Sequence, residues 1–226
     1  LERSSLSKLK RGVYVDKKVS ANSKLELKDV QLSIPVQENQ ADASIFSSYS
    51  QIQTSKDINK NNPLLNQDFF LEETRSKLTE IKNRCESILI AAGIDIPFGE
   101  RLEVSHHYGL NKFYEFGTSM ITVLNREYCK KYIFLFGGQK HPEQYHKQKD
   151  ETFILLYGDC KLILDNEMYF LQKNQPVSVK PKVIHSFSSN QGALIEELST
   201  THEKADSFYV DDKIINNHSR KSFIDF

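Results

Sequence analysis

The alternation of apolar and polar residues divides the chain into three stretches with different periods. Residues 1–71 consist of short polar and apolar units separated by turn residues, which predicts a compact β-rich domain with single helical turns. Residues 72–94 carry apolar side chains at helical spacing and end at Gly93, a residue that commonly terminates helices. We therefore expect a linker helix there, with its apolar face packed on one of the two flanking domains. Its apolar positions are Leu78, Ile81, Cys85, Ile88, Leu89 and Ala92.

Residues 95–226 form the third stretch, in which short apolar runs and a period of two replace the helical spacing. Turn signals such as Gly137-Gly138 and Asp165-Asn166 separate the runs. Many short strands with close turns are typical of a barrel or a double-sheet jelly roll. The overall prediction is a mainly β protein with some α-helix. The strands expected are Phe116–Leu124, Lys131–Phe136, Thr152–Tyr157, Cys160–Leu164, Met168–Leu171, Pro176–Val179 and Ala193–Leu198.

A weak internal repeat lies within the first stretch, at an offset of 39 residues. The segments "DKKVSANSKLELKDVQL" from Asp16 and "SKDINKNNPLLNQDFFL" from Ser55 share a lysine, a β-branched residue, leucines and an aspartate. Such short polar and apolar units favour a compact β-rich domain with single turns of helix.

Composition narrows the possible partners and compartment. Lysine plus arginine and aspartate plus glutamate both number 30, so no bulk field attracts nucleic acid or an anionic membrane. No apolar run is long enough to span a bilayer, and no signal peptide opens the sequence. Three widely spaced cysteines indicate reduced thiols, and we expect a cytoplasmic protein. Because the chain begins at Leu1, we also expect it to be part of a longer polypeptide.

All seven histidines follow residue 105, and the most informative run is "GGQKHPEQYHKQKDETFILLYG". Its key positions are Gly138, Gln144, His146, Glu151 and Gly158. We expect His146 and Glu151 to converge from consecutive strands inside a small barrel. Imidazole and carboxylate together suit a divalent metal such as manganese, zinc, nickel or iron.

Two further residues complete the predicted ligand set. His185 in "KPKVIHSF" is placed to supply another imidazole. Gln144 leaves three alternatives open, because an amide oxygen is a poorer ligand than imidazole. Gln144 is a metal ligand, it contacts the substrate instead, or the whole site binds no metal.

Other histidines and a tyrosine are candidates for substrate binding. His141 precedes Pro142 and is either a substrate contact or a packing residue. Of the adjacent His106 and His107, at most one faces the barrel interior if both lie in a strand, and we assign that role to His107. Tyr108, Tyr128 and Tyr157 either line a sugar pocket or pack in the core, and we assign substrate binding to Tyr108. We expect His202 and His218 to be surface or packing residues.

The run around Gln144 resembles the first cupin motif, and Pro181, His185 and Asn190 resemble parts of the second, with Asn174 and Lys182 where glycines are usual. The cupin-like motifs place a cupin domain at residues 95–226. Residues 1–71, especially "KLKRGVYVDKKVSANSKLELKDVQLSIP", resemble a SAF (antifreeze-like) domain that precedes the linker helix. This order is similar to the C-terminal part of N-acetylneuraminate (sialic acid) synthase-like proteins. "SHHYG", "HPEQYH", "EELSTTH" and "RKS" carry the likeness in the cupin portion.

Two departures from that family bear on function. The phosphoenolpyruvate-condensing TIM barrel of the synthases is absent from these residues. In addition, Ile34 stands before Pro35 where the family's SAF domains carry an arginine that contacts the sugar. An apolar side chain cannot donate those hydrogen bonds, so the resemblance implies a packing or dimerisation role for the SAF-like domain.

The cupin portion is also similar to D-lyxose isomerase-like cupins, which carry an H-x-H-x-x-K-x-E run. Gln144, His146, Lys149 and Glu151 match it apart from the first histidine. The resemblance implies a metal that polarises the sugar while side chains move a proton. Lys149 and Glu197 are the residues to which we assign proton transfer, and Glu196 is an alternative to Glu197.

Two functions therefore stay open. One is a metal-dependent cupin enzyme, an isomerase or epimerase acting on a sugar or sugar acid in nonulosonate or surface-polysaccharide biosynthesis. The other is a non-catalytic sugar-binding or dimerisation module of a longer synthase-like protein. In both, the likeness to cupins implies a homodimer.

Overall fold

The computed structural model describes residues 9–226, apart from residues 48, 97, 98 and 218, and the chain divides after Lys77 into two compact units. Strands dominate both units, as predicted. In the described part of the chain, no helix combines the length and the apolar character needed to cross a bilayer. The predicted helix is α2 (Arg75–Ala92), and the division between the units falls within its first turn.

The first unit contains two small sheets around one apolar core. β1 pairs with β3, and β4 lies between β2 and β5. Its elements are β1 (Gly12–Val15), β2 (Lys24–Leu25), η1 (Leu27–Asp29), β3 (Val30–Ser33), η2 (Ala43–Ile45), β4 (Ser50–Thr54) and β5 (Phe69–Glu73). The core consists of Val13, Val15, Val19, Leu25, Ala41, Ile52, Ile58 and Leu64. The structure thus has the short strands and single helical turns that the sequence predicted.

The sequence repeat corresponds to a repeat of structure. Val19 and Ile58, which are 39 residues apart, exchange both of their backbone hydrogen bonds. Asp29 and Asp68, at the same offset, are both buried, and each forms an ion pair of 2.7 or 2.8 Å with the equivalent lysine of its own half. The two halves therefore contribute equivalent strands and turns to one shared core.

Helix α2 places one face against the second unit. Leu78, Ile81, Cys85 and Leu89 are buried, at the positions that the helical period selected. The guanidinium of Arg84 lies 4.2 Å from the centre of the Phe136 ring. Because Phe136 and the core residue Leu135 lie on opposite faces of the same strand, α2 covers the outer face of that strand.

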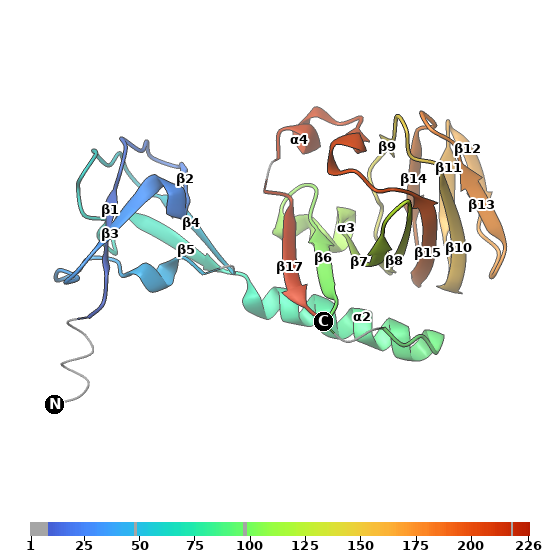
Figure 1. Ribbon diagram of the computed structural model, residues 1–226, viewed down its shortest axis with the longest axis horizontal. Coiled ribbons are helices and arrows are strands. Elements are labelled where there is room, and N and C mark those ends of the chain that lie inside the picture. Colours follow the sequence, from blue (N-terminus) through green and yellow to red (C-terminus); the bar gives the residue numbers. More distant parts are fainter. Residues whose placement is uncertain (1–8, 48, 97–98, 218) are drawn as a thin grey trace. The chain divides into compact units, whose positions relative to one another are not determined.

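Two antiparallel sheets form the rest of the second unit, a cupin-type jelly roll (Figure 1). The larger sheet has, in spatial order, β13 (Pro176–Val179), β10 (Glu151–Gly158), β15 (Gly192–Thr200), β8 (Tyr128–Phe136), β7 (Thr118–Asn125), β6 (Arg101–Ser105) and β17 (Lys221–Asp225). The smaller has β12 (Glu167–Phe170), β11 (Lys161–Leu164), β14 (His185–Ser188), β9 (Gln144–Tyr145) and β16 (Phe208–Tyr209). Short helical segments η3 (Leu110–Lys112), α3 (Phe113–Phe116), η4 (Lys204–Asp206) and α4 (Asp212–Ile215) connect them.

All seven expected strands are present, with ends that differ by up to three residues. Among the described residues of the second unit, five further strands were not predicted: β6, β9, β14, β16 and β17. They are short or mostly polar, and their pairing with distant strands, rather than an apolar run, holds them in the sheets.

The interior of the jelly roll has an apolar end and a polar end. Along β10, the side chains of Glu151, Phe153 and Leu155 alternate toward the interior, and along β15 Ala193, Ile195 and Glu197 do the same. The inward residues at the end of β10 and the start of β15 join the apolar core. The carboxylates at the opposite strand ends therefore face a polar space.

Turn geometry explains two features of the cupin-like motifs. Asn174 and Lys182, which stand where the second motif usually has glycine, both have positive φ, 61° and 72°. The chain therefore keeps the left-handed backbone that glycine would favour. At Gly158 a Cβ atom would lie 1.8 Å from the Gly192 carbonyl oxygen, so this position of the first motif requires glycine.

The three cysteines are buried and free, in agreement with the expectation of reduced thiols.

Candidate active site

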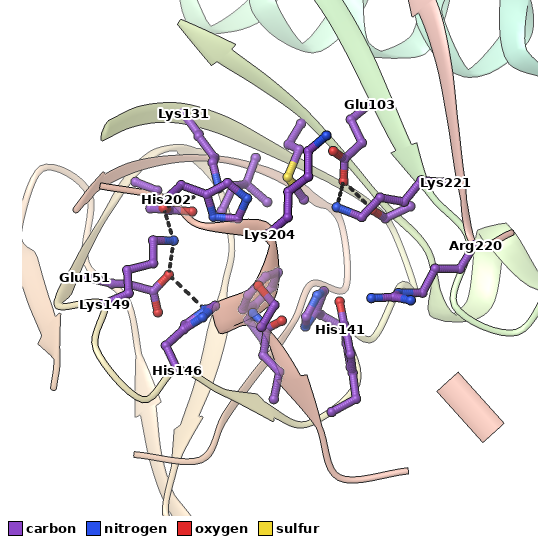
Figure 2. Close-up of a pocket in the computed structure, with 18 of the residues that line it drawn as sticks. Glu103, Lys131, His141, His146, Lys149, Glu151, His202, Lys204, Arg220 and Lys221 are labelled. Atoms are coloured by element: carbon purple, nitrogen blue, oxygen red, sulfur yellow. Dashed lines mark hydrogen bonds and ion pairs between the residues drawn. The ribbon is translucent and has the colours of Figure 1, made fainter. Parts of the chain in front are cut away.

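A cavity of about 280 Å³ occupies the polar end of the jelly roll (Figure 2). Residues from both sheets and from the segment after β15 line it. Its charged lining residues are Glu103, Lys131, Lys149, Glu151, Glu197, Lys204, Arg220 and Lys221. Four of these charged residues, Lys131, Lys149, Glu151 and Glu197, are buried, and this distinguishes the cavity from the apolar core.

His146, Glu151 and His185 meet at one point of this polar end. Each offers a ligand atom, and these atoms lie within 4.8 Å of one another. Glu151 opens β10, His185 opens β14, and His146 follows β9. All three side chains are at most 4% exposed. The structure thus brings together the three residues that the spacing of the motif had selected.

Backbone carbonyls orient both imidazoles. Nδ1 of His146 donates to the carbonyl of Asp206, and Nδ1 of His185 donates to the carbonyl of Val183 at 3.2 Å. With the proton on Nδ1, each Nε2 presents its lone pair to the interior. Both Nε2 atoms lie 3.4 Å from a carboxylate oxygen of Glu151.

This arrangement fits a divalent metal ion. Two imidazole lone pairs and a carboxylate face one another, and Oε2 of Glu151 is buried without a hydrogen-bond donor in the described part of the chain. A cation at their common centre would satisfy all three groups, which otherwise repel one another. Burial also lowers the pKa of His185, which favours the neutral form that binds metals.

Gln144 stands beside this triad. It is the cross-strand partner of His185, and its Nε2 lies 3.1 Å from Nε2 of His185. In this orientation the amide donates to the imidazole lone pair. Rotation of the amide by a half turn would present its oxygen instead. The amide of Gln144 is therefore close enough to a metal ion held by the triad to act as a ligand through its oxygen.

Lys149 links two buried carboxylates. Its Nζ lies 2.6 Å from Oε1 of Glu151 and 2.5 Å from Oε1 of Glu197. A dashed line in Figure 2 marks the pair with Glu151. Burial lowers the pKa of Lys149, but Glu197 and Glu151 outweigh it and raise the pKa above the usual lysine value. Lys149 is therefore a fixed ammonium between the triad and Glu197.

Glu197 is held in its ionised form. Burial raises its pKa, but Lys131 and Lys149 outweigh burial and hold the pKa below the usual carboxyl range. In the described part of the chain, the contacts of Glu197 with Lys131, Lys149 and Ser199 all involve Oε1. Oε2 is therefore available to a bound molecule. Glu196 points to the opposite face of β15 and pairs with Lys130 at 2.7 Å.

Asp206 organises the loop that carries His146 and Lys149. The sequence did not single out this aspartate. Its carboxylate accepts hydrogen bonds from the backbone N–H groups of residues 147, 148 and 149. Its carbonyl accepts from His146. One residue of η4 thereby fixes both the imidazole of His146 and the backbone that presents Lys149.

The three predicted substrate contacts have different positions. His141 lines the cavity and stacks on Phe187, with ring centres 4.4 Å apart. His107 is buried outside the cavity lining, with Nε2 accepting from the Tyr209 hydroxyl at 2.9 Å. Tyr108 donates to Asp211 at 2.6 Å and faces a neighbouring surface pocket. The structure does not bring His107 and Tyr108 to the cavity, because other elements already hold both side chains.

Other lining residues did not emerge as candidates from the sequence. One side of the cavity is built from β6, β16, β17 and the residue before β17. Its lining residues are Glu103, Tyr209, Arg220 and Lys221. His202 also lines the cavity, which corrects its prediction as a surface or packing residue. His218 lies outside the described residues. The segment "RKS", noted only for its resemblance, was the one sequence signal for Arg220 and Lys221.

Comparisons of sequence find sugar isomerases. The D-lyxose/D-mannose isomerase of Thermosediminibacter oceani is 26% identical over 171 residues, which cover 62% of this chain and 94% of the relative. The D-lyxose ketol-isomerase of a Thermofilum species is 26% identical over 130 residues, covering 45% of this chain and 72% of the relative. No protein-family model matches the sequence.

Comparisons of structure find sugar isomerases whose fold is similar to that of the second unit. The L-ribose isomerase of Cellulomonas parahominis superposes with a TM-score of 0.55 at 12% identity, over 66% of this chain and 96% of that chain. The L-ribose isomerase of Geodermatophilus obscurus gives 0.55 over 62% and 94%. The second unit is thus a cupin jelly roll of the kind found in sugar isomerases. These findings give no support to the predicted SAF and sialic acid synthase-like relationship.

Proposed function

We propose that the chain is a metal-dependent sugar isomerase that interconverts an aldose and a ketose in the cavity of its cupin unit. The observation that carries the proposal is the meeting of His146, Glu151 and His185, with Lys149 joining Glu151 to Glu197. The homologues named as D-lyxose isomerases support the reaction class. The cation would be manganese, zinc, nickel or iron, which imidazole and carboxylate ligands accept.

The chemistry needs a base beside the reacting carbons. In aldose–ketose interconversion, a base removes the proton from the carbon next to the carbonyl and returns it to the former carbonyl carbon. A second proton moves from the hydroxyl to the carbonyl oxygen. A bound divalent ion would supply polarisation of these two oxygens. The residues of this chain bind that ion, orient the sugar and move the protons.

Glu197 is the residue to which we assign the transfer between carbons. It is ionised, buried, and has Oε2 available inside the cavity. Lys149 holds the carboxylate in position and can donate a hydrogen bond to a sugar oxygen. Gln144 and His141 line the same space and provide hydrogen-bonding groups for hydroxyls.

A second candidate function is a non-catalytic sugar-binding or dimerisation module of a longer sialic acid synthase-like protein. The amide of Gln144 favours it, because in the present orientation it donates to the lone pair that His185 would give to a metal. The internal repeat of the first unit also suits an assembly role. On this hypothesis the first unit, within residues 1–71, is the SAF-like domain, and the chain works in nonulosonate or surface-sugar synthesis as a homodimer.

One experiment separates the two functions. The purified chain, stripped with a chelator and reloaded with manganese, zinc, nickel or iron, is incubated with a panel of aldoses and ketoses, and the products are resolved by chromatography. We expect metal-dependent interconversion of at least one pair. Glu197→Gln should slow it by about 10²- to 10⁴-fold, and Glu196→Gln, on the outer face of the same strand, should not. Absence of turnover with every metal would favour the binding module.

A further inference from the structure

The second side of the cavity, formed by Glu103, Tyr209, Arg220 and Lys221, has no role in the proposed proton transfer. Its charge is nevertheless unusual for a site that takes a neutral sugar. The described cavity lining contains five cationic side chains and three carboxylates. Burial lowers the pKa of His141 well below the usual range and that of His202 to about 3, so neither adds or removes charge near neutrality. The excess is therefore positive before any metal binds.

The ion pairs show where this excess lies. Glu151 and Glu197 pair with Lys149, and Glu103 pairs with Lys221 at 2.7 Å. In the described part of the chain, Arg220 and Lys204 have no carboxylate partner. The lining thus contains two cations whose charge no side chain balances.

Arg220 has the geometry of an anion-binding residue. Its contacts are with neutral groups: one terminal nitrogen donates to the Asn217 carbonyl at 3.2 Å, and the guanidinium lies 5.3 Å from the centre of the Tyr209 ring. Nε is buried and donates to no acceptor in the described part of the chain. In Figure 2 the guanidinium points toward His141. Because no carboxylate in the described part of the chain neutralises this guanidinium, its charge and its remaining N–H donors can serve an oxyanion.

The distance from the metal triad suits a single extended sugar. His185, Gln144 and Tyr209 are register neighbours on β14, β9 and β16. Adjacent strands are ~4.8 Å apart, so the backbone at Tyr209 is roughly 10 Å from that at His185. A pentose or hexose with its carbonyl end at the triad would therefore direct its far end toward Tyr209 and Arg220.

We propose that the substrate carries an anionic group, a phosphate or carboxylate, at the end remote from the reacting carbons, and that Arg220 binds it with help from Lys204 at the cavity mouth. This inference rests on the proposed function for the position of the sugar, and it specifies the substrate class. Lys221 contributes less, because Glu103 already balances its charge.

Binding of unreactive analogues tests the inference without turnover. Manganese-loaded chain is titrated calorimetrically with pentitols and hexitols, with their terminal phosphates and with the matching aldonates. We expect phosphates or aldonates to bind more tightly than the neutral parents, and the two anionic sets identify the anion. Arg220→Gln should weaken anion binding roughly 10- to 100-fold and leave the neutral polyols unchanged.

Matched variants keep the result interpretable. Arg126→Gln removes a charge from an exposed turn and should leave every affinity unchanged. Lys204→Gln alters an exposed side chain and should weaken the anions by a smaller factor, even if Arg220→Gln folds poorly. Equal affinity of wild type for anionic and neutral polyols would overturn the inference. If isomerisation fails but Arg220-dependent anion binding persists, the proposed reaction is wrong and the anion subsite stands.

Discussion

The two sides of the cavity differ in how their charges are balanced. On the side of β9, β10 and β14, the ligand side, two imidazoles and the Glu151 carboxylate converge, and Lys149 is held between two acids. On the side of β6, β16 and β17, the far side, the contacts of Arg220 with described residues are with neutral groups, and Lys221 has one acid partner among them. The ligand side has a geometry that one small cation would complete. The far side has an unbalanced positive charge that an anion would complete. A cavity with these two sides suits a substrate with two chemically different ends.

The largest expected effect concerns Glu197, which Lys149 joins to the ligand side. Glu197→Gln keeps the shape of the side chain and removes its basicity, so turnover should fall by about 10²- to 10⁴-fold. Metal content should stay unchanged, because Glu197 is not one of the three converging residues. The measurement is the initial rate with each active sugar, beside elemental analysis. A parallel loss of metal would assign Glu197 to the metal site instead.

Removal of the central ammonium should destabilise the ligand side strongly. Lys149→Met leaves Glu151 and Glu197 buried without their shared partner, at a cost of about 3–5 kcal/mol. Denaturant unfolding of metal-free protein measures it. Lys147→Met, which changes an exposed lysine next to the Phe208 ring, should cost less than about 1 kcal/mol. Similar losses in both variants would mean that the buried ion pairs contribute little.

A substitution that completes the imidazole set sharpens the comparison. Gln144→His would replace an amide with a stronger ligand beside His185 and should tighten metal binding by about tenfold, or about 1.4 kcal/mol. Competition with a chelator measures the affinity. If the affinity is unchanged, position 144 does not reach the ion, and Gln144 is left as a substrate contact.

The smallest effect is expected on the far side. Lys221→Met breaks a partly exposed pair with Glu103 and should cost roughly 1 kcal/mol or less. Metal affinity should not change, because the variant leaves the three converging residues intact. Thermal unfolding and the chelator competition, run together, check both expectations. Reduced metal affinity would show that the two sides are coupled, contrary to their separate roles.

The sequence predicted the ligand side because its information is local. Gln144, His146, Lys149 and Glu151 lie within one short run, and their spacing on consecutive strands determines which side chains meet. The period of two in the long apolar strands gave the jelly roll in the same way. Within a strand, the neighbour on the same face is known once the period is known.

The far side could not be read from local patterns. β6 and β17 are far apart in the sequence, near the start and the end of the second unit, yet they pair in the sheet. Their register places Phe223 opposite Glu103. Neither strand has an apolar run from which it could be predicted. The contact of Arg220 with Tyr209 depends on how the last strands pair in the two sheets. Asp206 was missed for a related reason, since its bonds to residues 146–149 bridge two distant loops.

Metal binding is the property on which the ligand side and the proposed isomerisation depend. Chelator-stripped chain is titrated with manganese in a calorimeter, beside Glu151→Gln, which keeps the volume of the side chain and removes its charge. We predict saturable binding of a single ion per chain in the wild type and a loss of at least 100-fold in affinity in the variant, or about 2.7 kcal/mol. Absence of saturable binding, or equal affinity in both proteins, would contradict the account.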